Sequence, residues 1–350
     1  MSGRTVYFTG PGEVEVRETT RSDPGAGEIA VEATVSAISP GTELLLYRGE
    51  MNPETAADET LPSLDGSLTY PFPYGYATVG EVTAVGPGVD PAWYGETVLA
   101  FHPHASDFVV DVDAVSRVPD GIPPERAVFL PNVETAVTLT MDGEPAIGER
   151  AVVFGQGVVG LLTTALLSTF PLERLVTLDC HGSRREAATA FGADRSVAPD
   201  DCDPAALCAP TGTGTGSPNA GGDGDAPDRA DLTYELSGNP AALDDAIAAT
   251  GYGGRVVVGS WYGAKPAALT LDGRFHRSRI ELRASQVSTL APERRGRWTT
   301  ERRLATAWRR LRDVDTERLV THRLPVAEAP EAYRLLDEEP ERALQVLLTY

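Results

Sequence analysis

A glycine-rich run provides the clearest chemical signal in this sequence. Gly155, Gly157 and Gly160 follow an apolar, strand-like segment, residues 151–154, and precede an apolar, helix-like segment, residues 161–167. With this spacing, the first glycine permits a tight turn, the second lets the backbone approach a pyrophosphate, and the third allows close helix–strand packing. The start of the helix adds free N–H groups and the positive end of a dipole. The run therefore predicts a dinucleotide-binding loop; a glycine-rich turn that binds nothing is the alternative.

An acidic residue at a suitable distance from the loop indicates which dinucleotide binds. Asp179 lies nineteen positions after Gly160, at the end of a second apolar segment, residues 175–178. A carboxylate at this place accepts hydrogen bonds from both ribose hydroxyls and repels a 2′-phosphate. Arg184 and Arg185 would offset that repulsion only by reaching around the carboxylate. We therefore expect NAD as the cofactor, with NADP less favoured.

The size and composition of the chain favour a two-domain protein without a membrane segment. A length of 350 residues exceeds the size at which one core usually keeps growing, and 41% of the residues are hydrophobic. No apolar run approaches the ~20 residues of a membrane span, and the first residues show no signal peptide. The three cysteines have neither disulfide nor zinc-ribbon spacing. We expect a cytoplasmic protein with a small-molecule substrate and no membrane partner.

Acidic residues greatly outnumber basic ones. The chain has 51 acidic and 30 basic residues, a formal net charge of −21, and Lys265 is its only lysine. Such a surface repels nucleic acid and anionic membranes, so neither is an expected partner. An excess of acids with almost no lysine resembles the proteins of salt-loving archaea, in which molar salt screens the repulsion. An acidic protein from a GC-rich genome is the alternative.

The pattern of predicted elements changes twice along the chain. Short strands separated by glycine and proline make residues 1–123 a β-rich domain. Strand and helix patterns then alternate over residues 124–285, which is the signature of a parallel sheet. Residues 286–350 are expected to return to the first domain. A stretch with almost no apolar residues, 209–230, is predicted to be a disordered insert in the second domain.

Several motifs occur in the order found in one superfamily. Residues 80–86 resemble its G-x-V-x-x-V-G strand, residues 191–194 its L-G-A-D segment, and residues 235–238 its fourth strand and turn. With the glycine-rich loop, they make nearly the whole chain resemble the medium-chain dehydrogenase/reductase superfamily. This resemblance implies an α/β fold, with a GroES-like, β-rich catalytic domain and a Rossmann domain containing a doubly wound parallel sheet.

The resemblance also extends to a subgroup and to further cofactor positions. Residues 38–43, 285–286 and 297–298 resemble the subgroup that includes the dehydrogenase acting on the hydroxyethyl side chain of bacteriochlorophyllide. The predicted cofactor-binding residues are Gly155, Gly157, Val158, Val159, Gly160, Asp179, Arg184, Thr135, Ser237 and Gly259.

The positions that hold zinc in the resembling alcohol dehydrogenases carry other residue types here. Matching the motifs places Pro40, Tyr76 and Pro131 where those enzymes have ligands of the catalytic zinc. Zinc ligands must be thiolate, imidazole or carboxylate groups, so no zinc is expected. The four-cysteine structural zinc lobe is also missing, because no cysteine precedes Cys180.

Two histidines lie close together in the first domain. His102 and His104, at positions i and i+2 of an expected strand, would face the same side. A pair without a nearby third ligand is more typical of a polar surface or the wall of a cleft than of a metal site. The sequence leaves open whether either histidine contributes to the active site.

Hydroxyl side chains are the groups left to act on a substrate oxygen. Without zinc, protein groups must polarise a carbonyl or deprotonate an alcohol. The positions that surround the reacting atom in the resembling enzymes fall on Ser39, Thr42, Tyr76 and Thr135. We expect Ser39, Thr42 and Tyr76 to be catalytic, with Thr42 donating to a substrate oxygen and Tyr76 replacing the metal as electrophile. In the alternative interpretation, Tyr76 only fills the space that the zinc ion occupies in the resembling enzymes. Glu43 is expected to be a structural hydrogen-bonding residue.

These observations predict an NAD(H)-dependent, zinc-independent oxidoreductase. It would transfer a hydride between nicotinamide and a hydroxyl or carbonyl group of a small organic substrate. Two alternatives remain: a quinone or enone reductase that uses NAD(P)H, and a nucleotide-binding protein without enzymatic activity. By analogy with the superfamily, we expect a homodimer.

Overall fold

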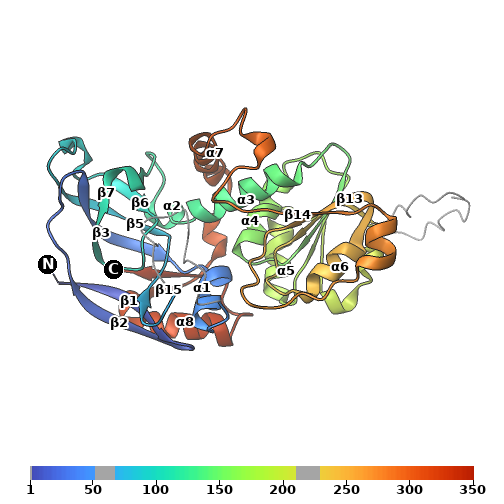
Figure 1. Cartoon of the computed structure of the whole chain (residues 1–350), viewed down its shortest axis with the longest axis horizontal. Helices are drawn as coiled ribbons and strands as arrows, with labels where there is room; N and C mark the ends of the chain where they lie inside the picture. Colours follow the sequence, from blue (N-terminus) through green and yellow to red (C-terminus); the bar gives the residue numbers. More distant parts are fainter. Residues whose placement is uncertain (1, 52–67, 210–228) are drawn as a thin grey trace, which may run out of the picture. The chain divides into compact units, whose positions relative to one another are not determined.

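The chain folds into two compact units (Figure 1). The computed structural model describes residues 2–51, 68–209 and 229–350. Unit 1 is formed by residues 1–131 and 308–350, and unit 2 by residues 132–307. The predicted boundaries were 123/124 and 285/286, whereas the chain passes between the units within two helices. The insert predicted at 209–230 lies almost entirely outside the described residues.

Unit 1 is built mainly from antiparallel strands. One sheet has the strand order β2-β1-β4, and a second has the order β15-β16-β3-β5-β6-β8, with β7 also paired to β3. Its elements are β1 (Ser2–Gly10), β2 (Glu13–Thr20), β3 (Glu28–Ala37), α1 (Pro40–Tyr47), β4 (Phe72–Pro73), β5 (Thr78–Val85), β6 (Thr97–Ala100), β7 (Asp107–Asp111), β8 (Val115–Arg117), α2 (Pro124–Ala127), β15 (Val320–Pro325), α8 (Ala329–Glu338) and β16 (Gln345–Thr349). Strand β3 pairs with β5, β7 and β16, so it joins the N-terminal and C-terminal parts of the unit.

Unit 2 contains a six-stranded parallel sheet with the order β11-β10-β9-β12-β13-β14. Its elements are α3 (Leu130–Gly143), which starts before the boundary, β9 (Arg150–Phe154), α4 (Val158–Leu167), β10 (Arg174–Leu178), α5 (Gly182–Ala190), β11 (Arg195–Val197), β12 (Ala230–Glu235), α6 (Ala241–Ala249), β13 (Thr250–Val258), β14 (Glu281–Ala284) and α7 (Thr300–Asp313), which ends after the second boundary. Numbered along the chain, the strands run 3-2-1-4-5-6, the doubly wound Rossmann order, which reverses between β9 and β12. The predicted α/β class, with a β-rich part and a doubly wound parallel sheet, is confirmed.

Helices cover both faces of the parallel sheet (Figure 1). On β9, Val152 and Phe154 belong to a buried cluster that contains Ile247 of α6, whereas Val153 belongs to a cluster that contains Leu167 of α4. Successive side chains of a strand point to opposite faces, so the two clusters lie on opposite sides of the sheet. Burial on both faces explains why these strands read as continuous apolar runs in the sequence.

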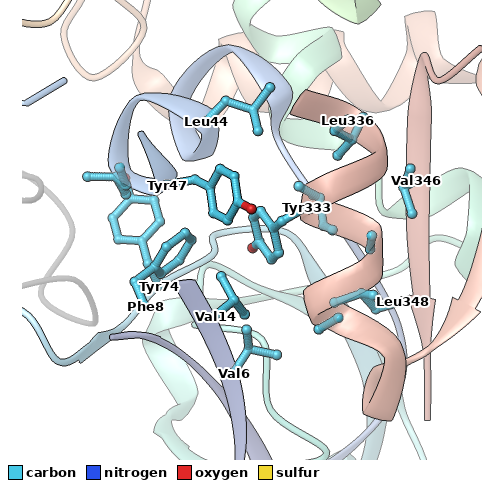
Figure 2. Packing of buried hydrophobic residues seen from close by; sticks show 14 of the residues in the cluster. Val6, Phe8, Val14, Leu44, Tyr47, Tyr74, Tyr333, Leu336, Val346 and Leu348 are labelled. Atoms are coloured by element: carbon cyan, nitrogen blue, oxygen red, sulfur yellow. The ribbon is translucent and has the colours of Figure 1, made fainter. Parts of the chain in front are cut away.

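An aromatic core in unit 1 holds helices α1 and α8 together (Figure 2). Tyr333 of α8 stacks on Tyr47 of α1 with ring centroids 5.8 Å apart, and it meets Phe8 of β1 edge-on at 5.1 Å. Ring pairs in these geometries contribute about 0.5–1.5 kcal/mol beyond the area they bury. All three rings are buried, so this packing fixes the position of α1, the helix that begins beside Ser39.

The helices of the described residues are short. Helices α3 and α7 have 14 residues each, against the ~20 needed to cross a bilayer. Among the residues that the structure describes, no helix is both long enough and apolar enough to span a membrane.

Candidate active site

Residues predicted to bind a dinucleotide gather at one edge of the parallel sheet in unit 2. The last residues of β9, β10, β12 and β13 lie side by side in register: Phe154, Leu178, Glu235 and Val258. Predicted cofactor residues follow them within one or two positions: Gly155, Asp179, Ser237 and Gly259. In doubly wound sheets, ligands bind outside the carboxyl ends of the strands, beside the point where the strand order reverses. The predicted residues therefore converge where such a ligand would lie.

The three loop glycines are required for different steric reasons. A Cβ on Gly155, whose φ is +86°, would lie 2.5 Å from the Cα of Ser237. A Cβ on Gly160 would lie 2.0 Å from the carbonyl oxygen of Gly155. In contrast, a Cβ on Gly157 would meet no atom of the described residues within 4 Å. Gly155 and Gly160 thus serve packing, whereas Gly157 keeps a space open in front of α4.

Helix α4 presents its backbone to that open space. Gly157 is its N-cap residue and has no side chain with which to cap the first N–H groups. The side chain of Val158 is buried, so this residue can meet a ligand only through its N–H group, whereas the side chain of Val159 packs against the core and is partly exposed. Gln156 also turns inward, where its side-chain oxygen accepts a hydrogen bond from Thr164 over 3.0 Å. The loop therefore offers backbone donors of the kind that bind phosphate.

Asp179 is tied to the glycine loop. Its Oδ2 accepts a hydrogen bond from the backbone N–H of Gln156 over 2.7 Å, and its Oδ1 accepts one from His181 over 2.8 Å. The residue is only 8% exposed, so these bonds determine where its carboxylate points. A carboxylate has about four acceptor sites, which leaves further sites for ribose hydroxyls.

The two arginines of α5 differ in their surroundings. The Nη1 of Arg185 donates to the backbone carbonyls of Asp179 and Cys180, over 2.8 and 2.9 Å. Arg184 is half-buried, and this burial lowers its pKa, against the opposing effect of the Asp179 charge. Arg185 is thus engaged with the backbone at the end of β10.

A buried glutamate at the same sheet edge was not among the predicted site residues. The Oε1 of Glu235 accepts hydrogen bonds from the N–H of Ser237, over 2.8 Å, and from its hydroxyl. Its Oε2 accepts one from Tyr262, whose pKa is raised by burial and then by this bond and the carboxylate charge. The backbone N–H of Gly259 donates to the Glu235 carbonyl over 3.0 Å. Glu235 therefore shapes both turns that follow β12 and β13; its motif was visible in the sequence, but its partners were not.

Three hydroxyl groups predicted to be catalytic meet in unit 1. The phenol of Tyr76 donates a hydrogen bond to the Oγ of Ser39, and it also hydrogen-bonds the side chain of Thr42. Ser39 is the N-cap of α1, and Thr42 lies in its first turn; Tyr76 lies just before β5. We call Ser39, Thr42 and Tyr76 the hydroxyl cluster. Thr135, the fourth predicted hydroxyl, lies half-buried on α3 in unit 2.

The surroundings of Tyr76 favour its protonated form. Burial raises the pKa of its phenol, and the negative charge of Glu43 raises it further, whereas hydrogen bonds with Ser39 and Thr42 act in the lowering direction. The net effect is a raised pKa. The phenol is therefore a hydrogen-bond donor at neutral pH and can deliver a proton to an oxygen that gains charge.

The two neighbouring histidines do not lie on a strand, so that prediction was wrong. Residues 101–104 have no strand structure, because Pro103 between them has no N–H with which to continue the ladder. His102 stacks on Phe108 with ring centroids 4.0 Å apart. His104 is fully buried instead, and its Nε2 is hydrogen-bonded to Glu43 over 3.0 Å. The two rings therefore have separate environments.

Glu43 is the centre of a buried polar cluster beneath the hydroxyl cluster. Its Oε1 accepts a hydrogen bond from the backbone N–H of Ser39 over 2.8 Å. Its Oε2 accepts hydrogen bonds from His104 and from the phenol of Tyr333. These two partners lie 61 and 290 positions away in the sequence. No spacing pattern could have revealed them.

The positions matched to zinc ligands offer none of the usual zinc donors. Pro40 is the first residue of α1, Pro131 is buried on α3, and Tyr76 belongs to the hydroxyl cluster. Proline has no side-chain donor, and the Tyr76 phenol keeps its proton. Over residues 2–51, 68–209 and 229–350, no three His, Cys, Asp or Glu side chains are placed to share a metal ion.

Comparisons with curated proteins point to dehydrogenases. No family model matches the chain. It is 25% identical over 367 residues to 2-desacetyl-2-hydroxyethyl bacteriochlorophyllide A dehydrogenase of Rhodobacter capsulatus, covering 99% of this chain and 98% of that protein. It is 27% identical over 288 residues to L-threonine 3-dehydrogenase of Thermococcus kodakarensis, covering 74% of each.

Solved structures share the fold. An alcohol dehydrogenase from Escherichia coli CFT073, complexed with NADH, matches 100% of this chain and 99% of its own, with a TM-score of 0.75 and 19% identity. Another solved structure of this fold is bound to NADP. These comparisons make the chain an oxidoreductase that is similar in sequence and fold to dehydrogenases of the medium-chain dehydrogenase/reductase type.

Proposed function

We propose that this chain is an NAD(H)-dependent, zinc-independent oxidoreductase. It transfers a hydride between nicotinamide and a hydroxyl or carbonyl group of a small organic substrate. The observation that carries the proposal is the contact of Tyr76 with both Ser39 and Thr42. This contact supports a site in which hydroxyl groups, rather than a metal ion, polarise the substrate oxygen.

The sheet edge in unit 2 fits a nicotinamide dinucleotide. Gly157 and the first N–H groups of α4 would hold its pyrophosphate, and Asp179 would accept hydrogen bonds from ribose hydroxyls. When bound, the dinucleotide supplies or accepts the hydride. The Asp179 charge disfavours a 2′-phosphate and therefore favours NAD over NADP.

Donor chemistry supports a reaction without zinc. Pro40 and Pro131 cannot bind a metal ion through their side chains, and the phenol of Tyr76 remains protonated at neutral pH. Elemental analysis of active protein is expected to give well below one zinc ion per chain. Stoichiometric zinc whose removal abolishes activity would contradict this part of the proposal.

In carbonyl reduction, Tyr76 acts as the proton donor. Its Oη–H turns from the Oγ of Ser39 to the carbonyl oxygen and transfers its proton there. With a hydride added to the carbonyl carbon, an alcohol forms and a phenolate remains. Ser39 and Thr42 then donate hydrogen bonds to the phenolate until solvent returns the proton. Proton transfer by a positioned side chain typically contributes 10²–10⁴-fold to the rate.

A substrate panel combined with one substitution tests the proposal. Alcohols, aldehydes, ketones, quinones and enones are assayed with NADH and NADPH in molar salt. Tyr76→Phe is expected to lower kcat about 100-fold with an unchanged dissociation constant for NADH. Tyr94→Phe, at a tyrosine that is 67% exposed in the same unit, is the matched control and should behave like the wild type.

Other outcomes of the panel distinguish the remaining functions. Turnover of quinones or enones alone would support the other reductase class. NADH binding without turnover of any substrate would support a nucleotide-binding protein without enzymatic activity. Full activity of Tyr76→Phe on carbonyls would remove the phenol from the reaction.

The charge of the chain supports a salt-loving protein. We extend the proposal to a cytoplasmic location, which the unpaired spacing of the cysteines supports, and to a homodimer by analogy with the fold. Mutual repulsion within a net charge of −21 is screened at high ionic strength. The free energy of unfolding is expected to rise from low to molar salt, as measured by chemical denaturation. Light scattering in molar salt would report twice the chain mass for a dimer.

A further inference from the structure

A buried pair, His104 and Glu43, contacts the hydroxyl cluster through the backbone N–H of Ser39. We propose that these two residues are the positioning residues of the reaction. They tie the backbone beside Tyr76 to the start of α1 and keep a carboxylate charge next to the phenol. The inference rests on the proposed function, because it assigns the support of the same hydroxyl cluster.

The imidazole of His104 lies against the residue that precedes Tyr76. A Cβ on Gly75, whose φ is +132°, would come within 2.7 Å of the Cδ2 and 2.8 Å of the Nε2 of His104. The backbone N–H of His104 also donates to the carbonyl of Tyr74 over 3.2 Å. Only glycine at position 75 permits this approach, so the ring and the backbone that carries Tyr76 are in direct contact.

The same imidazole reaches α1 through Glu43. The distance from the His104 Nε2 to the Glu43 Oε2 is 3.0 Å, and both side chains have an exposed fraction of 0%. The other carboxylate oxygen of Glu43 accepts the backbone N–H of Ser39 over 2.8 Å. Because the Oγ of Ser39 accepts the hydrogen bond of Tyr76, the contacts form a closed ring through Tyr76, Ser39, Glu43 and His104. The geometry of the hydroxyl cluster therefore depends on the buried pair.

The hydrogen-bond partners assign one tautomer to His104. An ionised carboxylate can only accept hydrogen bonds, so Nε2 carries the hydrogen toward Glu43. The Nδ1 then accepts from the Oγ of Ser36 over 2.7 Å, and this oxygen accepts from the phenol of Tyr350 over 2.8 Å. Tyr333 donates a further hydrogen bond to Glu43. With this assignment every bond in the chain has one donor and one acceptor.

The charge of Glu43 acts on the phenol of the hydroxyl cluster. Burial is the main cause of the raised pKa of Tyr76, and the charge of Glu43 adds to it. Removing the charge while keeping the shape of the side chain should let the phenol ionise at lower pH. The other titratable groups around the buried pair are His102, Tyr74, Tyr333 and Tyr350.

Glu43→Gln tests the role of the charge without requiring turnover. Ionisation of Tyr76 is followed by ultraviolet difference spectroscopy, and the signal is assigned by subtracting the same protein carrying Tyr76→Phe. We expect the transition at lower pH in Glu43→Gln than in the wild type. Asp107→Asn removes a carboxylate charge from the same unit, outside the ring of contacts, and should leave the transition where it is.

His104→Asn tests the positioning role separately, because it retains the Glu43 charge. We expect kcat to fall at least about tenfold in both variants, with unchanged KM for NADH. The Tyr76 transition should move in Glu43→Gln and stay near the wild-type pH in His104→Asn. Circular dichroism checks folding, and if Glu43→Gln does not fold, the kcat of His104→Asn decides.

Two results would overturn the inference. One is a folded His104→Asn with wild-type kcat, and the other is a Glu43→Gln whose Tyr76 transition coincides with that of Asp107→Asn. Failure of the proposed function would look different. The wild type would then turn over no substrate, while the spectroscopic comparison of Glu43→Gln with Asp107→Asn would still report the charge effect.

Discussion

The carboxylate of Asp179 accepts a hydrogen bond from the backbone N–H of Gln156 over 2.7 Å. This bond joins the end of β10 to the glycine loop that follows β9. The group expected to bind ribose and the groups expected to bind pyrophosphate are therefore held at a fixed separation. A ligand that needs both gains affinity from this preorganisation.

Gly157→Ala should weaken nucleotide binding without unfolding the protein. The added methyl group meets no atom of the part of the chain that the structure describes, but it enters the space expected for the pyrophosphate. We expect the dissociation constant for NADH to rise at least about tenfold, with the free energy of unfolding within about 0.5 kcal/mol of the wild type. Fluorescence titration and chemical denaturation measure the two quantities.

Gly160→Ala provides the contrast to that variant. Its Cβ would lie 2.0 Å from the carbonyl oxygen of Gly155, so the backbone itself must move. We expect a loss of about 3 kcal/mol in the free energy of unfolding. For the Gly157→Ala variant of the preceding paragraph, an NADH affinity equal to that of the wild type would exclude the glycine loop as the pyrophosphate site.

Asp179→Asn should narrow the preference for NADH over NADPH. The substitution keeps the shape but removes the charge that repels a 2′-phosphate, and one acceptor for ribose is lost. We expect the ratio of the two dissociation constants to fall at least about tenfold. Asp194→Asn is the control, because Asp194 also accepts a backbone N–H in unit 2, from Leu175 over 2.7 Å. An unchanged ratio in Asp179→Asn would refute the assignment.

Stability should decrease as the pH falls from about 6.5 toward 4 because of His102. Burial lowers the pKa of this imidazole from 6.5 to about 4. In this range the unfolded chain binds a proton that the folded chain does not. The contribution of the neutral His102 ring to the free energy of unfolding is therefore complete above the unfolded pKa and is lost as the pH falls toward the folded pKa. Because the His102 side chain is only half-buried, we expect the loss in the free energy of unfolding to be about 2 kcal/mol.

A comparison of two histidine variants isolates that effect. Urea unfolding at pH 7 and pH 5, at fixed ionic strength, should show a smaller pH dependence in His102→Asn than in the wild type. His276→Asn, at an exposed histidine, should retain the wild-type dependence. The same slope in all three proteins would show that His102 is not the source.

Arg303→Met should destabilise unit 2 strongly. The Nε and Nη2 of Arg303 lie 3.1 and 3.0 Å from one oxygen of Glu134, and the two side chains are 4% and 11% exposed. Burial raises the pKa of Glu134, and the arginine charge opposes this effect. Without its partner the carboxylate is buried and unpaired, which costs about 3 kcal/mol. The double variant with Glu134→Gln should regain part of this loss, and strictly additive losses would show that the two residues are not coupled.

Prediction from sequence succeeded where structure depends on neighbours in the chain. The apolar runs that form β9 and β10, the glycine spacing after β9 and the position of Asp179 all express local rules of strand, turn and helix. It failed for His102 and His104, because alternation along an expected strand was applied across Pro103, which cannot continue one.

The sequence by itself thus determined the α/β class, the parallel sheet and the glycine loop, because chain neighbours and periodicity encode them. Only the tertiary structure decided that Tyr76 meets Ser39 and Thr42, and that Glu43 is paired with His104 and Tyr333. Hydrogen-bond partners separated by up to 290 positions are chosen by packing, since a buried polar group must bond to whatever donor the fold brings within reach.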